Sequence, residues 1–120
     1  MFDILAGYYG SAGEATEHVV VKTFGVGGTT LRTRAQSAGY ATWGYFYEQN
    51  EVDFADRAPT WDLLGMDYSA SQSSWDALHL AAPSKRIIGH ICPTLASVET
   101  ARSKGATGFQ CSGVKSIYPI

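Results

Sequence analysis

Short β-branched and aromatic runs alternate with amphipathic segments along this 120-residue chain. The runs predict strands at residues 19–24, 41–47, 63–68, 86–92 and 107–111. Apolar residues three or four positions apart predict helices over 31–38, about 71–82 and 95–101. A helix therefore follows the first, third and fourth strands. Strands that alternate with helices predict a parallel α/β sheet.

Two further segments have weaker patterns. The first ten residues are apolar, and Phe2, Leu5 and Tyr8 stand at a spacing of three, which favours a short helix over a strand. A second short helix is predicted around 52–57, within an otherwise polar and acidic stretch.

The chain is predicted to form a single domain, 1–120, because neither a linker nor an internal repeat is visible. Within it, residues 1–17 form an N-terminal segment and residues 18–114 form the βα units. A length of 120 residues is enough to bury a hydrophobic core.

Composition narrows the class of protein. The chain is 45% hydrophobic and 17% charged with a net charge of -2, so it lacks the basic excess of a nucleic-acid-binding protein. No apolar run reaches the length of a membrane span, and the first residues lack the basic region of a signal peptide. We therefore expect a cytoplasmic or virion-associated protein. Cys92 and Cys111 are too few for a disulfide framework and are expected to be buried thiols.

Polar and aromatic side chains stand where the predicted strands end, which is where parallel α/β sheets bind ligands. These residues are Lys22, Tyr45, Tyr47, Asp67, Tyr68, His90, Cys92 and Cys111. Lys22 ends a valine run just before a glycine-rich turn, so its cation and the turn's backbone amides could bind a phosphate. The predicted ligand-binding glycines are Gly25, Gly27 and Gly28. The alternative is that Lys22 simply extends into solvent. The turn matches no nucleotide-binding motif.

Asp67 and His90 are expected on successive strand ends, where they could act as an acid/base pair. Together with Lys22 they are the candidate catalytic residues. The alternative for His90 is a packed side chain bonded to a backbone carbonyl. His90, Cys92 and Cys111 could also supply soft ligands to zinc, but the paired spacing of known zinc sites is absent, and no metal site is assigned.

An aromatic cluster is predicted on one strand. By alternation, Trp43, Tyr45 and Tyr47 share a face and could stack on the C–H face of a sugar. The alternative is that these rings fill the wall of a barrel. Tyr45 and Tyr47 are retained as candidate ligand-binding residues.

The stretch from Arg86 to Val114 carries a family resemblance. It reads as strand, helix, a Gly105-Ala-Thr-Gly108 turn and a second strand, and it resembles the last unit of glycerophosphodiester phosphodiesterase barrels. That unit has a Trp-Thr-Val-Asn strand end, a helix and a Gly-x-Asp-Gly turn; His90 falls where the family usually has its Trp. The segment 19–43 resembles another strand, helix, Gly and strand of the family, so the resemblance covers about 18–114.

The resemblance implies the C-terminal half of a (β/α)8 barrel, since a whole barrel needs about 250 residues. It implies a phosphodiester hydrolase of lipid metabolism that uses a divalent metal, Ca or Mg. The family's His-Arg-Gly, Glu-x-x-x-x-Asn and Glu-x-Lys motifs, and its Glu-x-Asp pair with a following His, are absent here, and Cys111-Ser112 replaces its final Thr-Asp. We therefore expect no cofactor in this chain, a metal only when a full site is completed, and no activity of the chain alone. The alternative is a non-catalytic binding or structural module, such as one of a phage particle.

A half-barrel would expose two sheet edges, here the strands 19–24 and 107–111, and one uncovered face. Side chains such as Val20, Ile88 and Phe109 would then meet water. The expected partners are therefore a second copy of the chain, forming a homodimer, or the missing half of the barrel. The expected ligand is a phosphodiester or a sugar, and neither nucleic acid nor a membrane span is expected.

Overall fold

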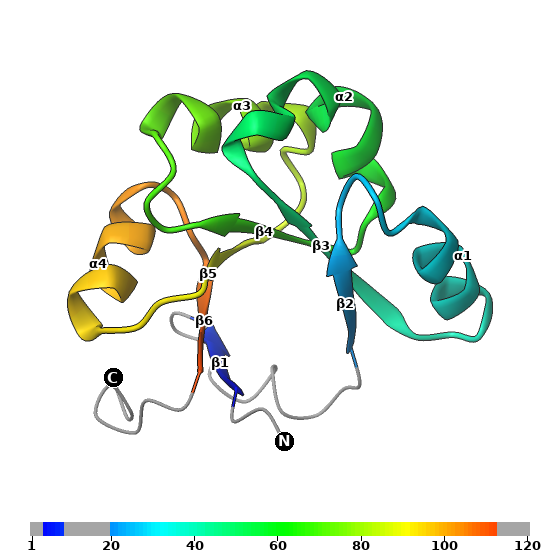
Figure 1. Ribbon diagram of the computed structural model, residues 1–120, viewed down its shortest axis with the longest axis horizontal. Coiled ribbons are helices and arrows are strands. Elements are labelled where there is room, and N and C mark those ends of the chain that lie inside the picture. Colours follow the sequence, from blue (N-terminus) through cyan, green and yellow to red (C-terminus); the bar gives the residue numbers. More distant parts are fainter. Residues whose placement is uncertain (1–3, 9–19, 113–120) are drawn as a thin grey trace.

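The computed structural model describes residues 4–8 and 20–112, which contain one six-stranded sheet of order β1-β6-β5-β4-β3-β2 (Figure 1). The strands are β1 (Ile4–Tyr8), β2 (Val20–Phe24), β3 (Ala41–Phe46), β4 (Leu63–Asp67), β5 (Ile87–His90) and β6 (Gly108–Ser112). Neighbours from β2 to β6 are parallel, and β1 is antiparallel to β6. The predicted parallel α/β fold is confirmed.

Helical segments connect each parallel strand to the next. They are α1 (Thr29–Ser37), η2 (Glu48–Asp53), α2 (Phe54–Arg57), η3 (Ala58–Thr60), α3 (Gln72–Ala81) and α4 (Leu95–Ser103). The strands stand side by side in chain order, and right-handed crossovers between such strands place every helix on the same face. Figure 1 shows α1 to α4 around the outside of a curved sheet. The parallel part of the sheet is thus wound in one direction.

Local signals account for where the helices begin and end. The Ser71 hydroxyl accepts the Ser74 backbone N–H at the start of α3, and Thr94 and Ser97 form a capping box at the start of α4. Gly39 (φ 88°) and Gly105 (φ 116°) follow α1 and α4 in the left-handed region that favours glycine, as predicted for helix stops.

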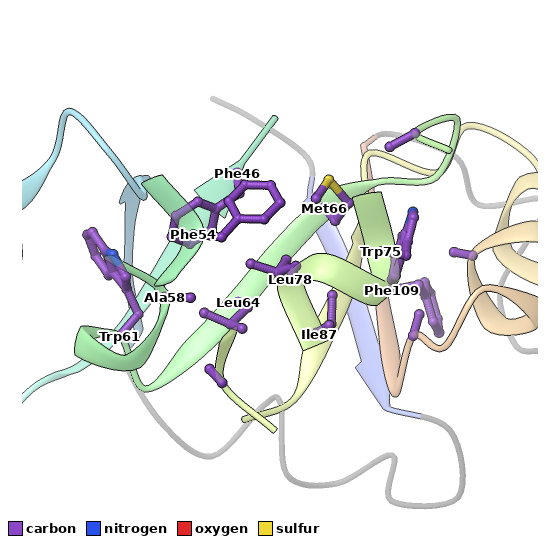
Figure 2. Packing of buried hydrophobic residues seen from close by; sticks show 14 of the residues in the cluster. Phe46, Phe54, Ala58, Trp61, Leu64, Met66, Trp75, Leu78, Ile87 and Phe109 are labelled. Atoms are coloured by element: carbon purple, nitrogen blue, oxygen red, sulfur yellow. The ribbon is translucent and has the colours of Figure 1, made fainter. Parts of the chain in front are cut away.

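The hydrophobic core lies between the sheet and the helices (Figure 2). Trp61 and Trp75 are 0% and 1% exposed within it. The Trp61 Nε1–H donates to the Gly25 carbonyl at 3.0 Å, and its ring lies directly over Gly44 of β3. A single large side chain thus joins the β2–α1 turn, β3 and the β3–β4 connection.

Residues 4–8 form a strand, so the predicted N-terminal helix is wrong for that part of the segment. The spacing of Phe2, Leu5 and Tyr8 suggested a helix, but a short apolar segment takes the conformation that a neighbouring edge stabilises. Here the neighbour is β6, and five residue pairs join the two strands.

Pairing with β1 also changes the predicted edges. β6 lies inside the sheet, so the prediction that strand 107–111 forms an edge is wrong, whereas β2 ends the sheet as predicted. Ile88 and Phe109 are 3% and 4% exposed, so the prediction that they meet water is wrong. Among the helices of residues 20–112, none combines the length and the apolar character that a membrane crossing requires.

Gly44→Ala is expected to lower the free energy of unfolding by about 2 kcal/mol, measured by urea denaturation. A Cβ at Gly44 would lie 2.4 Å from the buried Trp61 ring, and the cost of overpacking exceeds the roughly 0.5–1 kcal/mol that alanine gains over glycine in a strand. The matched control is Gly27→Ala, where no atom lies within 4 Å of the added Cβ, and we expect a change below about 0.5 kcal/mol. Equal effects at the two positions would contradict this packing.

Candidate ligand pocket on the concave face

The face of the sheet opposite the helices carries polar and aromatic side chains from several strands. Alternation places on this face Lys22 of β2, Trp43 and Tyr45 of β3, Asp67 of β4, His90 of β5 and Gln110 of β6. Trp43 and Tyr45 are each 8% exposed, and Gln110 is 2% exposed. The face is thus largely shielded from solvent although the described helices all lie on the other side.

Curvature of the sheet brings its distant strands together. The Lys22 ammonium Nζ donates to the Gln110 Oε1 at 2.6 Å, although three strands separate β2 from β6. In a flat sheet, four inter-strand spacings would place these two strands about 19 Å apart, farther than the two side chains can span. The sheet must therefore curl, and this face is concave.

A pocket of about 380 Å³ opens at the C-terminal end of this face. Its lining residues are Lys22, Thr23, Phe24, Tyr45, Tyr47 and His90. Four of the predicted site residues, Lys22, Tyr45, Tyr47 and His90, are brought together here. Phe24 and Gln110, the hydrogen-bond partner of Lys22, were not predicted from the sequence. Alternation along β2 could have indicated Phe24, because it places Phe24 on the same face as Lys22.

Lys22 is an amine in aromatic surroundings. Its Nζ lies 4.7 Å from the centre of the Trp43 ring and 5.2 Å from that of Tyr45, within range of cation–π attraction. Burial lowers the pKa of Lys22 to about 8, because the charged form loses its hydration. The polar partner described for the amine is the neutral Gln110 amide.

His90 is 5% exposed and lies against Tyr45, with 3.6 Å between the ring centres. Burial, and secondly the charge of Lys22, lower the pKa of His90 to about 3, so the imidazole is neutral at physiological pH. Within the described part of the chain, the buried His90 Nδ1 and the buried Trp43 Nε1 have no hydrogen-bond partner. Buried polar atoms normally have one, so these two nitrogens are exceptions to the usual pairing.

Tyr45, Tyr47 and Phe24 form the aromatic wall of the pocket. The ring centres of Tyr45 and Tyr47 are 4.4 Å apart, and that of Phe24 is 6.2 Å from Tyr45. Burial is the largest of the causes that raise the pKa of Tyr45. The smaller causes are its hydrogen bond with Tyr47 and the charges of Tyr47 and Asp67. The Tyr45 phenol therefore keeps its proton across the physiological range.

Asp67 stands beside His90 in the register of β4 and β5, but its described hydrogen bonds go elsewhere. Its Oδ1 accepts the Ser69 N–H at 2.8 Å and the Ser69 hydroxyl at 2.6 Å, which closes the turn after β4. Because the His90 Nδ1 is unpartnered, the carboxylate does not hold the imidazole through that atom. Asp67 and His90 therefore lie on the same face of the sheet, as predicted, but no hydrogen bond joins the Asp67 carboxylate to the His90 Nδ1.

The three glycines predicted to bind ligand lie in the turn between β2 and α1. The Gly25 N–H donates to the Tyr45 carbonyl at 2.7 Å, and the Gly28 N–H donates to the Phe24 carbonyl at 2.9 Å. Both amides are thus engaged within the protein. A Cβ at Gly25 would meet the Phe46 ring at 2.4 Å, whereas Gly27 has open space around it. Two of the glycines thus serve chain packing.

No cluster of three or more His, Cys, Asp or Glu side chains suited to a metal occurs among the described residues. Cys92 is buried in the core cluster, whereas His90 lies on the concave face, and the Cys111 side chain lies outside the described residues. A Glu-x-Asp tripeptide, Glu51-Val52-Asp53, does occur, but no His follows it closely as in the family. It lies in η2, and the Glu51 carboxylate accepts a hydrogen bond from the Ser74 hydroxyl.

Comparison of the chain with protein-family models, with curated proteins and with solved structures found no match in any of the three. The fold itself defines a parallel α/β protein, wound in one direction, with its candidate pocket on the face away from the helices.

His90 should make the protein sensitive to acid. Its pKa of about 3 in the folded protein is below the ordinary histidine value of 6.5, so the unfolded chain binds the extra proton between these pH values. Stability that is present above pH 6.5 is therefore lost as the pH falls toward 3. We expect His90→Gln to remove about 2 kcal/mol from the loss of unfolding free energy between pH 7 and pH 5. The control is His79→Gln, at an exposed position of α3, which should keep the wild-type pH dependence. Identical profiles for the two variants would contradict the assignment.

Proposed function

We propose that this chain is the C-terminal part of a barrel related to the glycerophosphodiester phosphodiesterases, and that it binds the phosphodiester without hydrolysing it alone. The observation that carries the proposal is the amine of Lys22, which extends from the middle of β2 onto the concave face, lines the pocket and has neutral partners. The consecutive order of the parallel strands agrees with a barrel half.

An anion complements the charge of this pocket. The partners described for the Lys22 ammonium are an amide oxygen and two aromatic rings, none of which carries a negative charge. Burying a charge without a counter-charge is costly, and the lowered pKa of Lys22 reports that cost. A phosphodiester would supply one negative charge and acceptor oxygens beside the amine, so bound ester should raise the pKa of Lys22.

The remaining groups suit the alcohol part of the ester. His90 lines the pocket as a neutral imidazole, whose ring nitrogens donate or accept a hydrogen bond according to the tautomer. A hydroxyl group of glycerol or of a sugar could pair with this imidazole. The rings of Phe24, Tyr45 and Tyr47 offer flat apolar surface to the C–H groups of the same ligand.

The pocket does not fit the Ca or Mg that the family resemblance implies. Both ions need several oxygen ligands with negative charge nearby, whereas this pocket presents an ammonium group, aromatic rings and a neutral imidazole. A metal would therefore have to be held by the complementary half of the barrel. We derive no metal-dependent step from the residues of this chain.

The position of β1 favours a second candidate, a binding or structural module that stands alone. In a closed barrel, the first strand of the missing half would pair with the outer edge of β6. In this chain that edge is already paired with β1. The neighbouring reading frame separates the candidates: a polypeptide with the His-Arg-Gly and Glu-x-Asp motifs upstream favours the hydrolase, and its absence favours the module.

Calorimetric titration with glycerophosphocholine should detect binding by the wild-type protein, and Lys22→Met should weaken it at least tenfold, about 1.4 kcal/mol. Affinity should fall as pH rises through about 8, because the amine loses its charge. Lys22→Arg keeps the charge and should retain binding, and the control Lys85→Met should change nothing. Unaltered affinity in Lys22→Met would overturn the assignment of the pocket.

With Ca or Mg present, we expect the isolated chain to release no choline from glycerophosphocholine. Turnover that disappears when Lys22→Ala and His90→Ala are combined would show that this chain needs no second half. Turnover that survives both changes would show that the reaction occurs outside this pocket.

We propose that the chain associates with itself through β2, the parallel strand that ends the sheet. The unpaired side of an edge strand can pair with another chain, and Phe24 adds an aromatic ring that is 55% exposed. Analytical ultracentrifugation at micromolar concentration should show twice the chain mass of 12.9 kDa. Val20→Lys places a charge on this edge and should give monomers, whereas the same change at exposed Leu80 of α3 should not. A folded wild-type monomer would overturn the proposal.

A further inference from the structure

Lys22 combines two properties: its side chain is half-buried, and it lines an open pocket. Trp43 and Tyr45 cover its ammonium end, and Phe24 and Tyr47 extend the apolar wall beside it. The pocket volume of about 380 Å³ falls in the range of small-molecule sites. A lysine desolvated in this manner is the usual form of an amine nucleophile.

We propose that Lys22 captures small aldehydes and ketones with a flat apolar body, forming an imine between its Nζ and the carbonyl carbon. The aromatic wall would hold the body of the ligand, and the amine would meet its carbonyl group. This inference concerns a different ligand chemistry from the phosphodiester proposal. Either one can fail without the other, because anions bind the ammonium form and carbonyl compounds react with the free amine.

The surroundings of Lys22 keep part of the amine unprotonated at neutral pH. With a pKa of about 8, about one tenth of the amine is free at pH 7, against about one in three thousand for a lysine at 10.5. The titratable groups of this face are His90, which is neutral, Tyr45, which keeps its proton, Tyr47, and Asp67 at the end of β4. The polar atom in contact with the amine is the Gln110 amide oxygen, which can accept a hydrogen bond from either form.

The reaction balances with water as its only other product. The lone pair of the free amine forms the C–N bond as the carbonyl π bond opens, the oxygen gains a proton from solvent, and the nitrogen loses one to solvent. The resulting hydroxyl leaves as water after a second protonation, and the nitrogen lone pair forms the C=N bond. Sodium cyanoborohydride then gives hydride to the protonated imine carbon, which leaves a stable secondary amine on the lysine.

The chain provides its own reference amines. Lys85 lies in the turn before β5, outside the pocket. The Lys104 amine donates to the Tyr68 carbonyl at 2.8 Å and to the Ala70 carbonyl at 2.6 Å, so carbonyl oxygens hold it away from the pocket. The α-amino group of the expressed chain also reacts with aldehydes near neutral pH and has to be resolved as a separate peptide.

The test is reductive labelling of the full chain at pH 7 with benzaldehyde and sodium cyanoborohydride, followed by peptide mapping by mass spectrometry. We expect a benzyl group on Lys22 at a rate roughly 10- to 50-fold above Lys85 and Lys104. This range is smaller than the gain in free amine because nucleophilicity falls with pKa. The rate at Lys22 should rise with pH and level off above about 8. Lys22→Arg, which keeps the charge, should remove only this adduct, and Lys85→Arg should leave it unchanged.

Denaturant supplies a control that needs no variant. In concentrated urea the pocket is lost, so labelling of Lys22 should fall to the rate of the other lysines. Equal labelling of Lys22, Lys85 and Lys104 in the folded protein, or labelling confined to the α-amino group, would overturn the proposal. So would an advantage of Lys22 that persists in urea, because it would arise from local sequence and not from the pocket.

Discussion

All described helices cover one face of the sheet, and this constraint governs the rest of the structure. Parallel strands in chain order leave the second face without a helical layer, so that face can exclude water only by curving toward itself. The hydrogen bond between Lys22 and Gln110 spans the resulting arc from β2 to β6. Trp43 and Tyr45 fill the hollow between the strands, and both are nearly buried.

The same curvature produces the electrostatics of the pocket. A lysine on an edge strand would ordinarily reach solvent, but here the curved sheet brings Lys22 against Trp43 and Tyr45. Burial is the first cause of the lowered pKa of Lys22, of the lowered pKa of His90 and of the raised pKa of Tyr45. One geometric cause thus shifts three groups toward their neutral forms.

The strands of the parallel sheet were predictable because β-branched and aromatic runs bounded by glycine carry a local signal. The candidate residues Lys22, Tyr45, Tyr47 and His90 followed from the rule that parallel sheets bind ligands at strand ends. β1 was not predictable, since its conformation depends on pairing with β6 about a hundred residues away. Gln110 escaped notice for a related reason: its contact with Lys22 exists only once the sheet has curved.

The glycine-rich turn was predicted to bind phosphate from its sequence alone. In the structure, the Gly25 and Gly28 amides donate hydrogen bonds to carbonyl groups, and the absence of a side chain at Gly25 leaves space for the Phe46 ring. Tertiary contacts of this kind have no local sequence signal.

The antiparallel strand β1 has a consequence for any second chain that would pair with β6. Because β1 belongs to the same polypeptide as β6, it meets that edge at an effective concentration in the millimolar range, whereas a separate chain in the cell meets it at its own far lower concentration. An incoming strand of similar intrinsic affinity at micromolar concentration is therefore outcompeted by roughly a thousandfold. Pairing of a second chain with β6 is therefore a strand-exchange reaction. Only a partner whose other contacts add several kcal/mol of binding free energy, beyond that of the strand itself, can displace β1.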